Sequence, residues 1–449
     1  MIPNKNIFCN APWFELQIYW DGSLGFCCAE NHKIYAPSEK STYNIKNMSI
    51  TEWMNAEPMR RMRQAMFGDK ELSICHRCQQ EQRTGGTSRR HKSNAKSVLF
   101  TKTGFNESFE QSPHKDVFLN SYNNNGMLKT YPIDLHIDLG NYCNLACKMC
   151  GPYASSKIAS QYKKWGIETD KKGIKIDKKI LLDWTSDETV WRKTLNELLG
   201  FKNLENVHFM GGETILSKRF VNFLDFMIEN KKTDFNISFV TNGTIIDYDV
   251  IERLKQFSKR VNIELSIETV TEHNSYIRQG TDTDQVLKHI EIYRNICNTQ
   301  NWDFTIRPAV GLLSVGYYHT LLNYCLEHQL LCKALMVNWP EYFRIEHLPK
   351  HIKQQYLKKY IELTEKFSLE KETTNNDYNE SDRHEYRKVI KKDINSIMLL
   401  LNTDQTSDSN EKLKEMVSWC QRWDKVYHYD AKKLYPEFES IFKEHGYEL

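Results

Sequence analysis

Three cysteines at positions 143, 147 and 150 constrain this chain more than any other feature. They follow residues 133–139, whose alternation of apolar and polar side chains predicts a strand. A loop leaving that strand can bring three thiolates to one inorganic group. Thiolates are the soft ligands of iron–sulfur clusters, and because cubane clusters usually take four, three would leave one iron open. A zinc site would need a fourth Cys or His nearby, and none follows Cys150 within the next fifty residues.

Composition and charge limit the classes of protein to which this chain can belong. The 449 residues leave room for about three domains, and a hydrophobic content of 40% is ample for a core. Lys+Arg number 61 against 58 Asp+Glu, so the net charge of +3 favours neither nucleic acid nor a membrane surface. No apolar stretch approaches a membrane span, and the first residues lack the apolar core of a signal peptide. We therefore expect a cytoplasmic protein whose cysteines are metal ligands rather than disulfides.

A second group of cysteines lies in the N-terminal region. Residues 12–20 and 24–28 predict two strands joined by a hairpin turn at Asp21-Gly22, and residues 50–67 predict a helix. Cys9 precedes the hairpin, Cys27 and Cys28 end it, and Cys75 and Cys78 follow the helix. Together they can supply four thiolates to one site, which suits an iron–sulfur cluster or a structural zinc ion.

Strand-like and helix-like segments alternate from about residue 131 to 345. We expect strands at residues 133–139, 206–210, 236–240, 261–267, 304–310 and 334–339. Helices are expected at residues 154–165, 218–230, 248–258, 283–298 and 319–331. This order implies a parallel sheet with right-handed crossovers, in which chemistry collects at the C-terminal ends of the strands. Gly211-Gly212-Glu213 follows the second strand and Thr241-Asn242-Gly243 the third, where that rule places functional residues.

The cysteine motif and the Gly-Gly-Glu turn together resemble the radical S-adenosylmethionine (SAM) enzymes. In that family the three cysteines hold a 4Fe–4S cluster whose open iron binds SAM. Reductive cleavage gives methionine and a 5′-deoxyadenosyl radical, which abstracts hydrogen from a substrate. The resemblance implies an α/β fold with a partial (β/α)6 barrel, and it spans nearly the whole chain.

The N-terminal cysteines are similar to the twitch domain, a shortened relative of the SPASM domain that carries an auxiliary cluster. The pattern C-x12-G-x4-C followed by C-x2-C matches Cys9, Gly22, Cys27, Cys75 and Cys78. The resemblance implies a second 4Fe–4S cluster on the four cysteines. Cys28 is the alternative to Cys27, although family spacing favours Cys27 with Cys28 packing inward. The module precedes the barrel, as in a subgroup whose likeness extends through residues 85–89. Zinc stays open as the occupant.

The resemblance also assigns contacts to SAM. Gly211, Gly212 and Glu213 would hold its amino group, and Thr214 stands where relatives have Pro. Ser266 and Glu268 would take the ribose hydroxyls, with Glu268 in place of the usual Asp, and Arg278 would pair the methionine carboxylate. The other expected contacts come from residues beside the motifs: Tyr142, Met149, Thr241 and Asn242. Asn242 as a plain turn residue and Arg278 as a surface ion pair remain alternatives.

We expect four regions: a twitch-like domain at 1–82, a linker at 83–130, the barrel at 131–345 and an α-helical cap at 346–449. The basic run at residues 89–92 is interpreted as a solvated face of the linker. The cap has helical spacing interrupted at residues 373–377 and 403–410. The isolated cysteines are expected to be buried as small hydrophobes, namely Cys297, Cys325, Cys332 and Cys420.

The leading hypothesis is a radical SAM enzyme, an oxidoreductase or peptide-modifying enzyme, that acts on a peptide or protein side chain. One alternative is a radical SAM enzyme acting on a sugar or nucleotide. A different class is a non-catalytic iron–sulfur redox or sensor protein, which would leave Gly211-Gly212-Glu213 without a purpose. The family implies a flavodoxin or ferredoxin as reductant, and neither nucleic acid nor membrane is expected as a partner. No general base is marked out by spacing.

Overall fold

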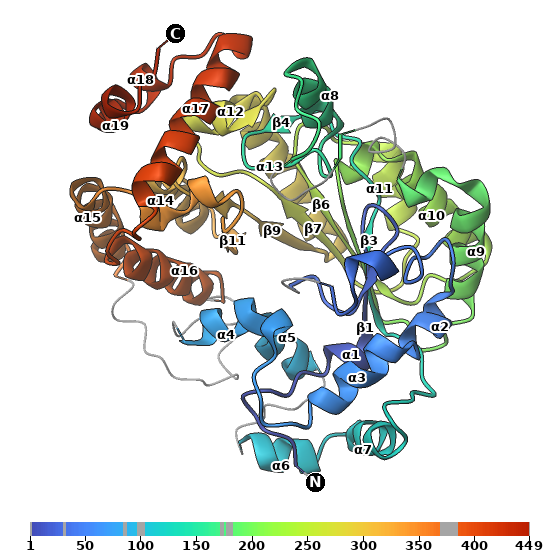
Figure 1. The fold of residues 1–449 in the computed structure, drawn as a ribbon. Helices are drawn as coiled ribbons and strands as arrows, with labels where there is room; N and C mark the ends of the chain where they lie inside the picture. The colour runs from blue at the N-terminus through green and yellow to red at the C-terminus, as the bar shows by residue number, and fades with distance from the viewer. Residues whose placement is uncertain are drawn as a thin grey trace. The chain divides into compact units, whose positions relative to one another are not determined.

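The computed structural model describes residues 2–29, 33–83, 88–96, 104–170, 175–176, 183–368 and 385–448. The chain divides into two compact units. Unit 1 comprises residues 1–143, 152–239 and 247–262, and unit 2 comprises residues 144–151, 240–246 and 263–449. Two strands, β6 (Asn236–Thr241) and β7 (Val261–Leu265), cross the division and contribute to both units. Figure 1 colours the chain from blue at the N-terminus to red at the C-terminus.

Unit 1 starts with short elements around the N-terminal cysteines and continues into alternating strands and helices (Figure 1). Besides the first parts of β6 and β7, its strands are β1 (Glu15–Ile18), β2 (Leu24–Gly25), β3 (Asp134–Asp138) and β5 (Asn206–Met210). Its helices are α1 (Ala11–Phe14), α2 (Ile50–Met54), α3 (Glu57–Ala65), α4 (His76–Arg83), α5 (Arg89–Lys96), α6 (Phe105–Glu110), α7 (Lys115–Asn123), α8 (Ser156–Lys164), α9 (Glu188–Leu199), α10 (Lys218–Glu229) and α11 (Tyr248–Leu254).

The sheet of unit 1 has one apolar face, which forms the core. Its strands lie in the order β2-β1-β3-β5-β6, antiparallel between β2 and β1 and parallel beyond them. The register aligns four fully buried side chains across the sheet, Leu16, Leu135, Val207 and Ile237. Helix α10 packs on this face, where the rings of Phe223 and Phe209 are 4.7 Å apart. Burying each such side chain stabilises the fold by about 1.5–3 kcal/mol.

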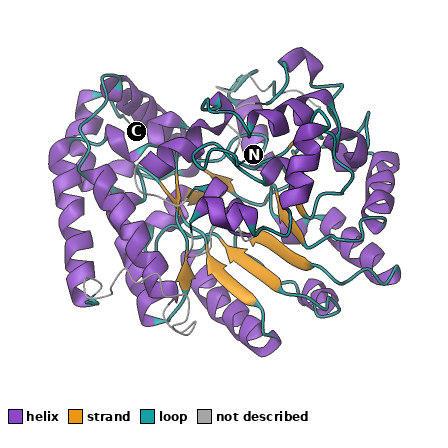
Figure 2. Ribbon diagram, turned by 90° about the horizontal axis from the view of Figure 1, so that it is seen from below, coloured by secondary structure: helices purple, strands orange, loops and turns teal. Residues whose placement is uncertain are grey.

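Unit 2 contains the later strands and the C-terminal helices. Figure 2 shows strands in orange and helices in purple. Besides the last parts of β6 and β7, its strands are β4 (Ala146–Cys147), β8 (Arg278–Gln279), β9 (Asp303–Ile306), β10 (Ala309–Val310), β11 (Leu331–Cys332) and β12 (Leu335–Met336). Its helices are α12 (His273–Ile277), α13 (Thr283–Gln300), α14 (Val315–Glu327), α15 (Lys350–Lys366), α16 (Glu385–Leu401), α17 (Ser409–Tyr427), α18 (Ala431–Leu434) and α19 (Glu439–Glu444).

The strands of unit 2 form a parallel ladder and two small sheets. The order is β6-β7-β9-β11, while β10 pairs with β12 in parallel and β4 pairs with β8 antiparallel. Helices α15 and α16 lie side by side (Figure 1). Among the described residues, no helix has the length and apolarity needed to cross a bilayer.

The predicted mixed α/β fold with a parallel sheet and a helical C-terminal region is confirmed. The strand expected at 206–210 has those bounds, and the helices expected from 248 and 283 begin there. Asp247 and Asp282 fix these starts because their carboxylates accept from Val250 N at 3.0 Å and Gln285 N at 3.1 Å. The four isolated cysteines are buried, as expected. The interruption at 373–377 lies outside the described residues.

Several expected elements are wrong in extent, and proline explains three of them. Residues 12–14 are helical because Pro12 suits a first helical turn, so only β1 remains of the strand expected at 12–20. The helix expected at 50–67 is two helices, since Pro58 starts α3 after an extended Ala56. The strand expected at 304–310 breaks between β9 and β10, at Pro308, which has no N–H to donate.

The sixth strand was also misplaced. The last strand of the ladder is β11, which begins at the last residue of the helix expected at 319–331. That helix, α14, ends earlier than expected, at Glu327. The expected segment 334–339 contributes β12, which pairs with β10 instead. The strand expected at 261–267 ends at Leu265, so Ser266 and Glu268 lie just beyond it.

The region expected as a linker contributes to the N-terminal core. Phe118 of α7 lies with its ring 5.2 Å from both Phe8 and Trp13. Phe109 of α6 joins the same aromatic group, 5.6 Å from Phe8. The four-region division of the chain itself stays a prediction.

Arg63 of α3 joins several loops of this N-terminal part. Its guanidinium is fully buried and donates to three backbone carbonyls, those of Pro12 (2.9 Å), Gly126 (2.6 Å) and Met54. Burial lowers the pKa of Arg63 to about 9.

Replacing Arg63 with Met should lower the free energy of unfolding by about 3 kcal/mol, because three buried carbonyls lose their donors. Arg61→Met, in the same helix but with an exposed ion pair to Glu57, should cost about 0.5 kcal/mol or less. Denaturant unfolding of both full-length variants measures the difference. Equal losses would show that Arg63 is not an anchor.

Candidate metal and cofactor sites

The loop that follows β3 and carries the three cysteines (residues 139–151, here called the cluster loop) begins in unit 1. There its first residues meet the Gly-Gly-Glu turn at the C-terminal ends of β3 and β5. Asp138 pairs with Met210, so residues 139 and 211 leave neighbouring strands at the same edge. Glu213 N donates to Tyr142 O at 2.8 Å, one residue before Cys143. The structure therefore brings two predicted motifs together.

Gly211 and Gly212 make this approach possible. Both have positive φ, +92° and +55°. A Cβ on Gly211 would lie 1.9 Å from Asp138 Oδ1, and one on Gly212 would lie 2.2 Å from Tyr142 O. Only glycine fits a left-handed backbone with a neighbour so close. The Glu213 side chain is 2% exposed and accepts from Ile215 N at 3.3 Å, which fixes it at the turn.

Cys147 and its neighbours lie in unit 2. The antiparallel pairing of β4 with β8 sets Cys147 opposite Arg278, whose Nη1 is 3.9 Å from Cys147 Sγ. Contact with the Cys150 thiol, together with the Arg278 charge, lowers the pKa of Cys147 despite its burial. The lowered pKa favours the thiolate that a metal requires. Cys143 belongs to unit 1, where its backbone N–H donates to Ser156 Oγ at 3.2 Å.

Arg278 and Glu268 are partners in a buried ion pair. Arg278 Nη2 donates to Glu268 Oε1 at 3.0 Å, and its Nε donates to the other carboxylate oxygen. Burial opposes the charge on Arg278, but Glu268 and Cys147 together raise its pKa. Glu268 also accepts from Ala309 N at 3.2 Å. The ion pair of Arg278 is therefore buried and does not lie on the surface.

Ser266 lies just beyond β7 and continues its pairing with β6, because its backbone N–H donates to Thr241 O at 2.9 Å.

Asn242 connects the end of β6 to the cluster loop within unit 2. Its Nδ2 donates to Asn144 Oδ1 at 2.8 Å, and Asn144 Nδ2 donates to Thr244 Oγ1 at 2.9 Å. The side-chain oxygen of Asn242, Oδ1, also accepts from Thr244 N at 3.0 Å, as in an Asx turn. Thr241 Oγ1 accepts from Gly243 N at 3.2 Å. Asn242 is thus both a turn residue and a support for the loop.

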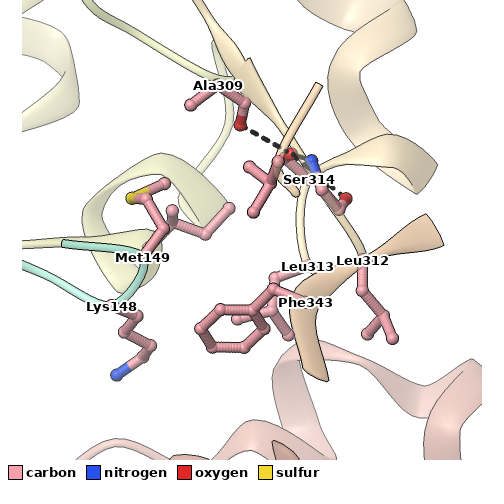
Figure 3. Close-up of a pocket in the computed structure, with 10 residues that line it drawn as sticks. Lys148, Met149, Ala309, Leu312, Leu313, Ser314 and Phe343 are labelled. Carbon is pink, nitrogen blue, oxygen red and sulfur yellow. Dashed lines mark hydrogen bonds between the residues drawn. The ribbon is translucent and has the colours of Figure 1, made fainter. Parts of the chain in front are cut away.

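Met149 lines a small apolar cavity in unit 2. Figure 3 shows Met149 and Lys148 with Ala309, Leu313 and Phe343 around this cavity. The Ser314 hydroxyl donates to Ala309 O at 3.3 Å and accepts from Gly311 N at 2.9 Å, which holds the turn that forms one wall.

Four N-terminal cysteines line a second small cavity, in unit 1. Cys9 precedes α1, Cys27 follows β2, and Cys75 and Cys78 lie at the start of α4. Cys27 is buried, whereas Cys28 is exposed and does not line the cavity. The expectation that Cys28 packs inward is therefore wrong. Its thiol still contacts that of Cys27, and this contact lowers the pKa of Cys28 to about 7 despite the opposing effect of desolvation.

Four thiols are a donor set that, by its chemistry, serves either a 4Fe–4S cluster or a zinc ion. Burial, and next the Glu15 charge, raise the pKa of Cys9, so metal binding must supply the energy to deprotonate it. The Arg90 side chain also lines the cavity and brings a positive charge. In the part of the chain that the structure describes, no three His, Cys, Asp or Glu side chains are grouped as around a single ion. In a cubane each thiolate binds its own iron, so its ligands lie farther apart.

Sequence reasoning missed a polar face in unit 1. Arg89 is mostly buried and donates to Glu15 Oε2 at 2.6 Å, and the same nitrogen lies 3.1 Å from His136 Nε2. His136 and His208 align across β3 and β5, with ring centroids 5.1 Å apart. The interpretation of residues 89–92 as a solvated face is wrong for Arg89 and Arg90. Arg89 is held against this part of the sheet, and Arg90 is buried, where it donates to Asn6 O and Gln82 Oε1.

A signal for this face was present in the sequence. Asp134 and His136 alternate with Leu135 and Ile137, so their side chains share one side of β3. When a strand is buried on both faces and carries polar residues at every second position, the side of the sheet that those residues face must be a polar part of the interior.

Replacing Gly212 with Ala should lower the free energy of unfolding by at least about 2 kcal/mol, because the added methyl meets a backbone carbonyl. Gly166→Ala is the matched control: its φ is +67°, but nothing lies within 4 Å of an added Cβ. Thermal or denaturant unfolding separates backbone strain, which both variants share, from the collision. A loss no larger than that of Gly166→Ala would contradict the observed approach.

Comparison with known proteins identifies both regions. The radical SAM superfamily model matches residues 137–306, and the SPASM model of an iron–sulfur cluster-binding domain matches residues 9–79. No curated protein matches the chain.

Solved structures resemble the chain only at low sequence identity. SuiB of Streptococcus suis, bound to the precursor peptide SuiA, is 16% identical with a TM-score of 0.36; the match covers 65% of this chain and 60% of SuiB. The protein anSMEcpe with bound AdoMet is 17% identical with a TM-score of 0.38, covering 53% of this chain and 62% of anSMEcpe. The chain thus matches less than two thirds of either protein. Residues 137–306 therefore form a radical SAM domain, and residues 9–79 form an N-terminal SPASM-type iron–sulfur domain.

Proposed function

We propose that this chain is an enzyme that cleaves SAM reductively and abstracts hydrogen from a peptide or protein side chain. The observation that carries the proposal is the contact between the Gly-Gly-Glu turn and the cluster loop, Glu213 N to Tyr142 O at 2.8 Å. A non-catalytic iron–sulfur protein would have no use for a buried carboxylate on a turn that is bonded to the residue before its first cluster ligand. A SAM enzyme needs one to accept from the ligand's ammonium group.

Cys143, Cys147 and Cys150 would hold the 4Fe–4S cluster, which when bound supplies the electron for SAM cleavage. Arg278 lies within 3.9 Å of Cys147 and would offset the negative charge of the thiolates. Its pairing with Glu268 fixes the guanidinium in place, so the two residues would act on SAM together rather than as separate contacts.

The other residues expected to contact SAM would each have a separate role. Glu213, with the glycines beside it, would accept from the SAM amino group. Ser266 and Glu268 would take the ribose hydroxyls. Thr241 and Asn242 would also contact SAM, and Asn242 would in addition support the cluster loop through Asn144. Met149 would give an apolar contact from the cavity that it lines. Tyr142, with 63% of its surface exposed, is available to a ligand above the loop.

Cys9, Cys27, Cys75 and Cys78 would hold the auxiliary cluster. Their convergence on one cavity supports this assignment, and the exposure of Cys28 favours Cys27 as the ligand. The peptide or protein substrate rests on the resemblance to radical SAM enzymes with an auxiliary-cluster domain, which often modify ribosomally made peptides. A cytoplasmic location and a flavodoxin- or ferredoxin-type reductant are part of the same proposal.

The test is anaerobic reconstitution with iron and sulfide, followed by SAM, dithionite and an assay for 5′-deoxyadenosine. We expect about eight irons per chain, two cubanes, and formation of 5′-deoxyadenosine. Cys147→Ala should form none while keeping the auxiliary iron. Iron binding without any SAM cleavage, with candidate peptides present or absent, would refute the enzyme.

Cys27→Ser should lower the iron content by about four per chain, because one thiolate of the auxiliary set is lost. Cys28→Ser is the matched control next to it and should keep the full iron content, since Cys28 is exposed outside the cavity. Iron and zinc are both counted in purified protein. The reverse pattern would make Cys28 the ligand, and zinc without iron at this site would replace the auxiliary cluster with a structural ion.

A further inference from the structure

Lys148 is a buried cation between two of the proposed cluster ligands. It lies in unit 2, 1% exposed, between Cys147 and Cys150 in the sequence. Its ammonium lies 4.0 Å from the ring centroid of Tyr276 and 5.5 Å from that of Trp423. A buried ammonium requires a counter-charge, because aromatic faces replace only part of its lost hydration.

Asp424 of helix α17 supplies that counter-charge. Its Oδ1 lies 3.8 Å from Lys148 Nζ, and both side chains are almost fully buried. The other oxygen, Oδ2, accepts from Tyr447 OH at 2.6 Å, Ala431 N at 3.1 Å and Tyr276 OH at 3.2 Å. Three donors from different elements therefore fix the carboxylate, and through it the position available to the Lys148 ammonium.

The backbone of the cluster loop is held at the same place. Trp419 of α17 donates from Nε1 to Lys148 O at 3.3 Å. On the other side, Lys148 N donates to Ile277 O at 2.8 Å, which continues the pairing of β4 with β8. Helix α17 therefore contacts both the side chain and the carbonyl of the residue that separates Cys147 from Met149.

We propose that Asp424 and Trp419 are positioning residues for the cluster loop, so that the C-terminal helices are a working part of the cluster site. The inference rests on the proposed function only in taking Cys147 and Cys150 as cluster ligands. Asp424 anchors Lys148 by charge, and Trp419 anchors its carbonyl. The loop between the two cysteines is thereby set before any cluster binds, which lowers the entropy lost on binding.

The first test needs no cluster. Hydrogen–deuterium exchange of residues 144–151 is measured in the full chain without metal. Asp424→Asn should speed exchange there at least about tenfold, because the buried ammonium loses its counter-charge. The control is Lys353→Met, another lysine of the C-terminal region that is 1% exposed and donates to Glu346 O and Thr403 O at 2.8 and 2.9 Å. It should leave residues 144–151 unchanged. Equal exchange in wild type and Asp424→Asn would overturn the proposal.

A milder variant guards against a fold that fails. Trp419→Phe keeps the aromatic packing and removes only the Nε1 donor, so it should speed exchange of residues 144–151 about threefold or more. Unchanged exchange in Trp419→Phe would remove Trp419 from the proposal. The double variant Lys148→Met/Asp424→Asn should exchange no faster than Asp424→Asn alone, because the two residues act as one pair. Additive effects would show that they act separately.

The second test is the electron paramagnetic resonance (EPR) spectrum of reconstituted, reduced protein. Asp424→Asn should alter the signal of the cluster on Cys143, Cys147 and Cys150 and lower its iron, while the iron on the four N-terminal cysteines stays. Lys353→Met should change neither. An unaltered spectrum in Asp424→Asn would contradict a positioning role. If wild-type protein binds no cluster at the three cysteines, the proposed function fails, and the exchange measurement still decides the inference.

Discussion

The register between β3 and β5 is the constraint on which the candidate site depends. Pairing Asp138 with Met210 makes the cluster loop and the Gly-Gly-Glu turn leave the sheet at one edge. The backbones then approach so closely that a Cβ on Gly212 would overlap Tyr142 O. A slip of one residue would turn every inward side chain outward and separate the two motifs. The ladder thus converts two sequence motifs 60 residues apart into neighbours.

The same register organises the two faces of the sheet. Leu135 and Ile137 face the helices and form the core, whereas Asp134 and His136 face the opposite side with Arg89 and Glu15. The charges there are paired, as buried charges must be. Helix α5, which follows the N-terminal cysteines, supplies Arg89 to this face and Arg90 to the four-cysteine cavity. In unit 1, helix α5 therefore contributes side chains both to the four-cysteine cavity and to the polar side of the sheet.

Much of this could be predicted because it depends on local patterns. The cysteine spacings, the strand at 206–210 and the capped starts of α11 and α13 follow from neighbouring residues. What failed depended on tertiary contacts. Nothing near residues 331–332 marks them as the last strand of the ladder, since two residues carry no period. The basic run at 89–92 has the composition of a solvated segment, and only contact with Glu15 and His136 places part of it inside.

Partnerships were harder to predict than positions. Arg278 and Glu268 were each assigned to SAM by resemblance, but their hydrogen bonds to each other depend on the return of β8 beside β4. The ion pair of Lys148 could not be predicted from the sequence, because its partner, Asp424, is 276 residues away along the chain. The proposed positioning role gives the C-terminal helices a function that their lysine- and glutamate-rich composition does not suggest.

The central claim is that one cluster has an open iron that binds SAM while the other cluster does not. The EPR spectrum of dithionite-reduced, reconstituted protein, recorded with and without SAM, tests this most directly. The account predicts that SAM shifts one of two cluster signals, and that Cys143→Ala abolishes the shifted signal and leaves the other. Two signals that are both indifferent to SAM, or a shift that survives Cys143→Ala, would contradict it.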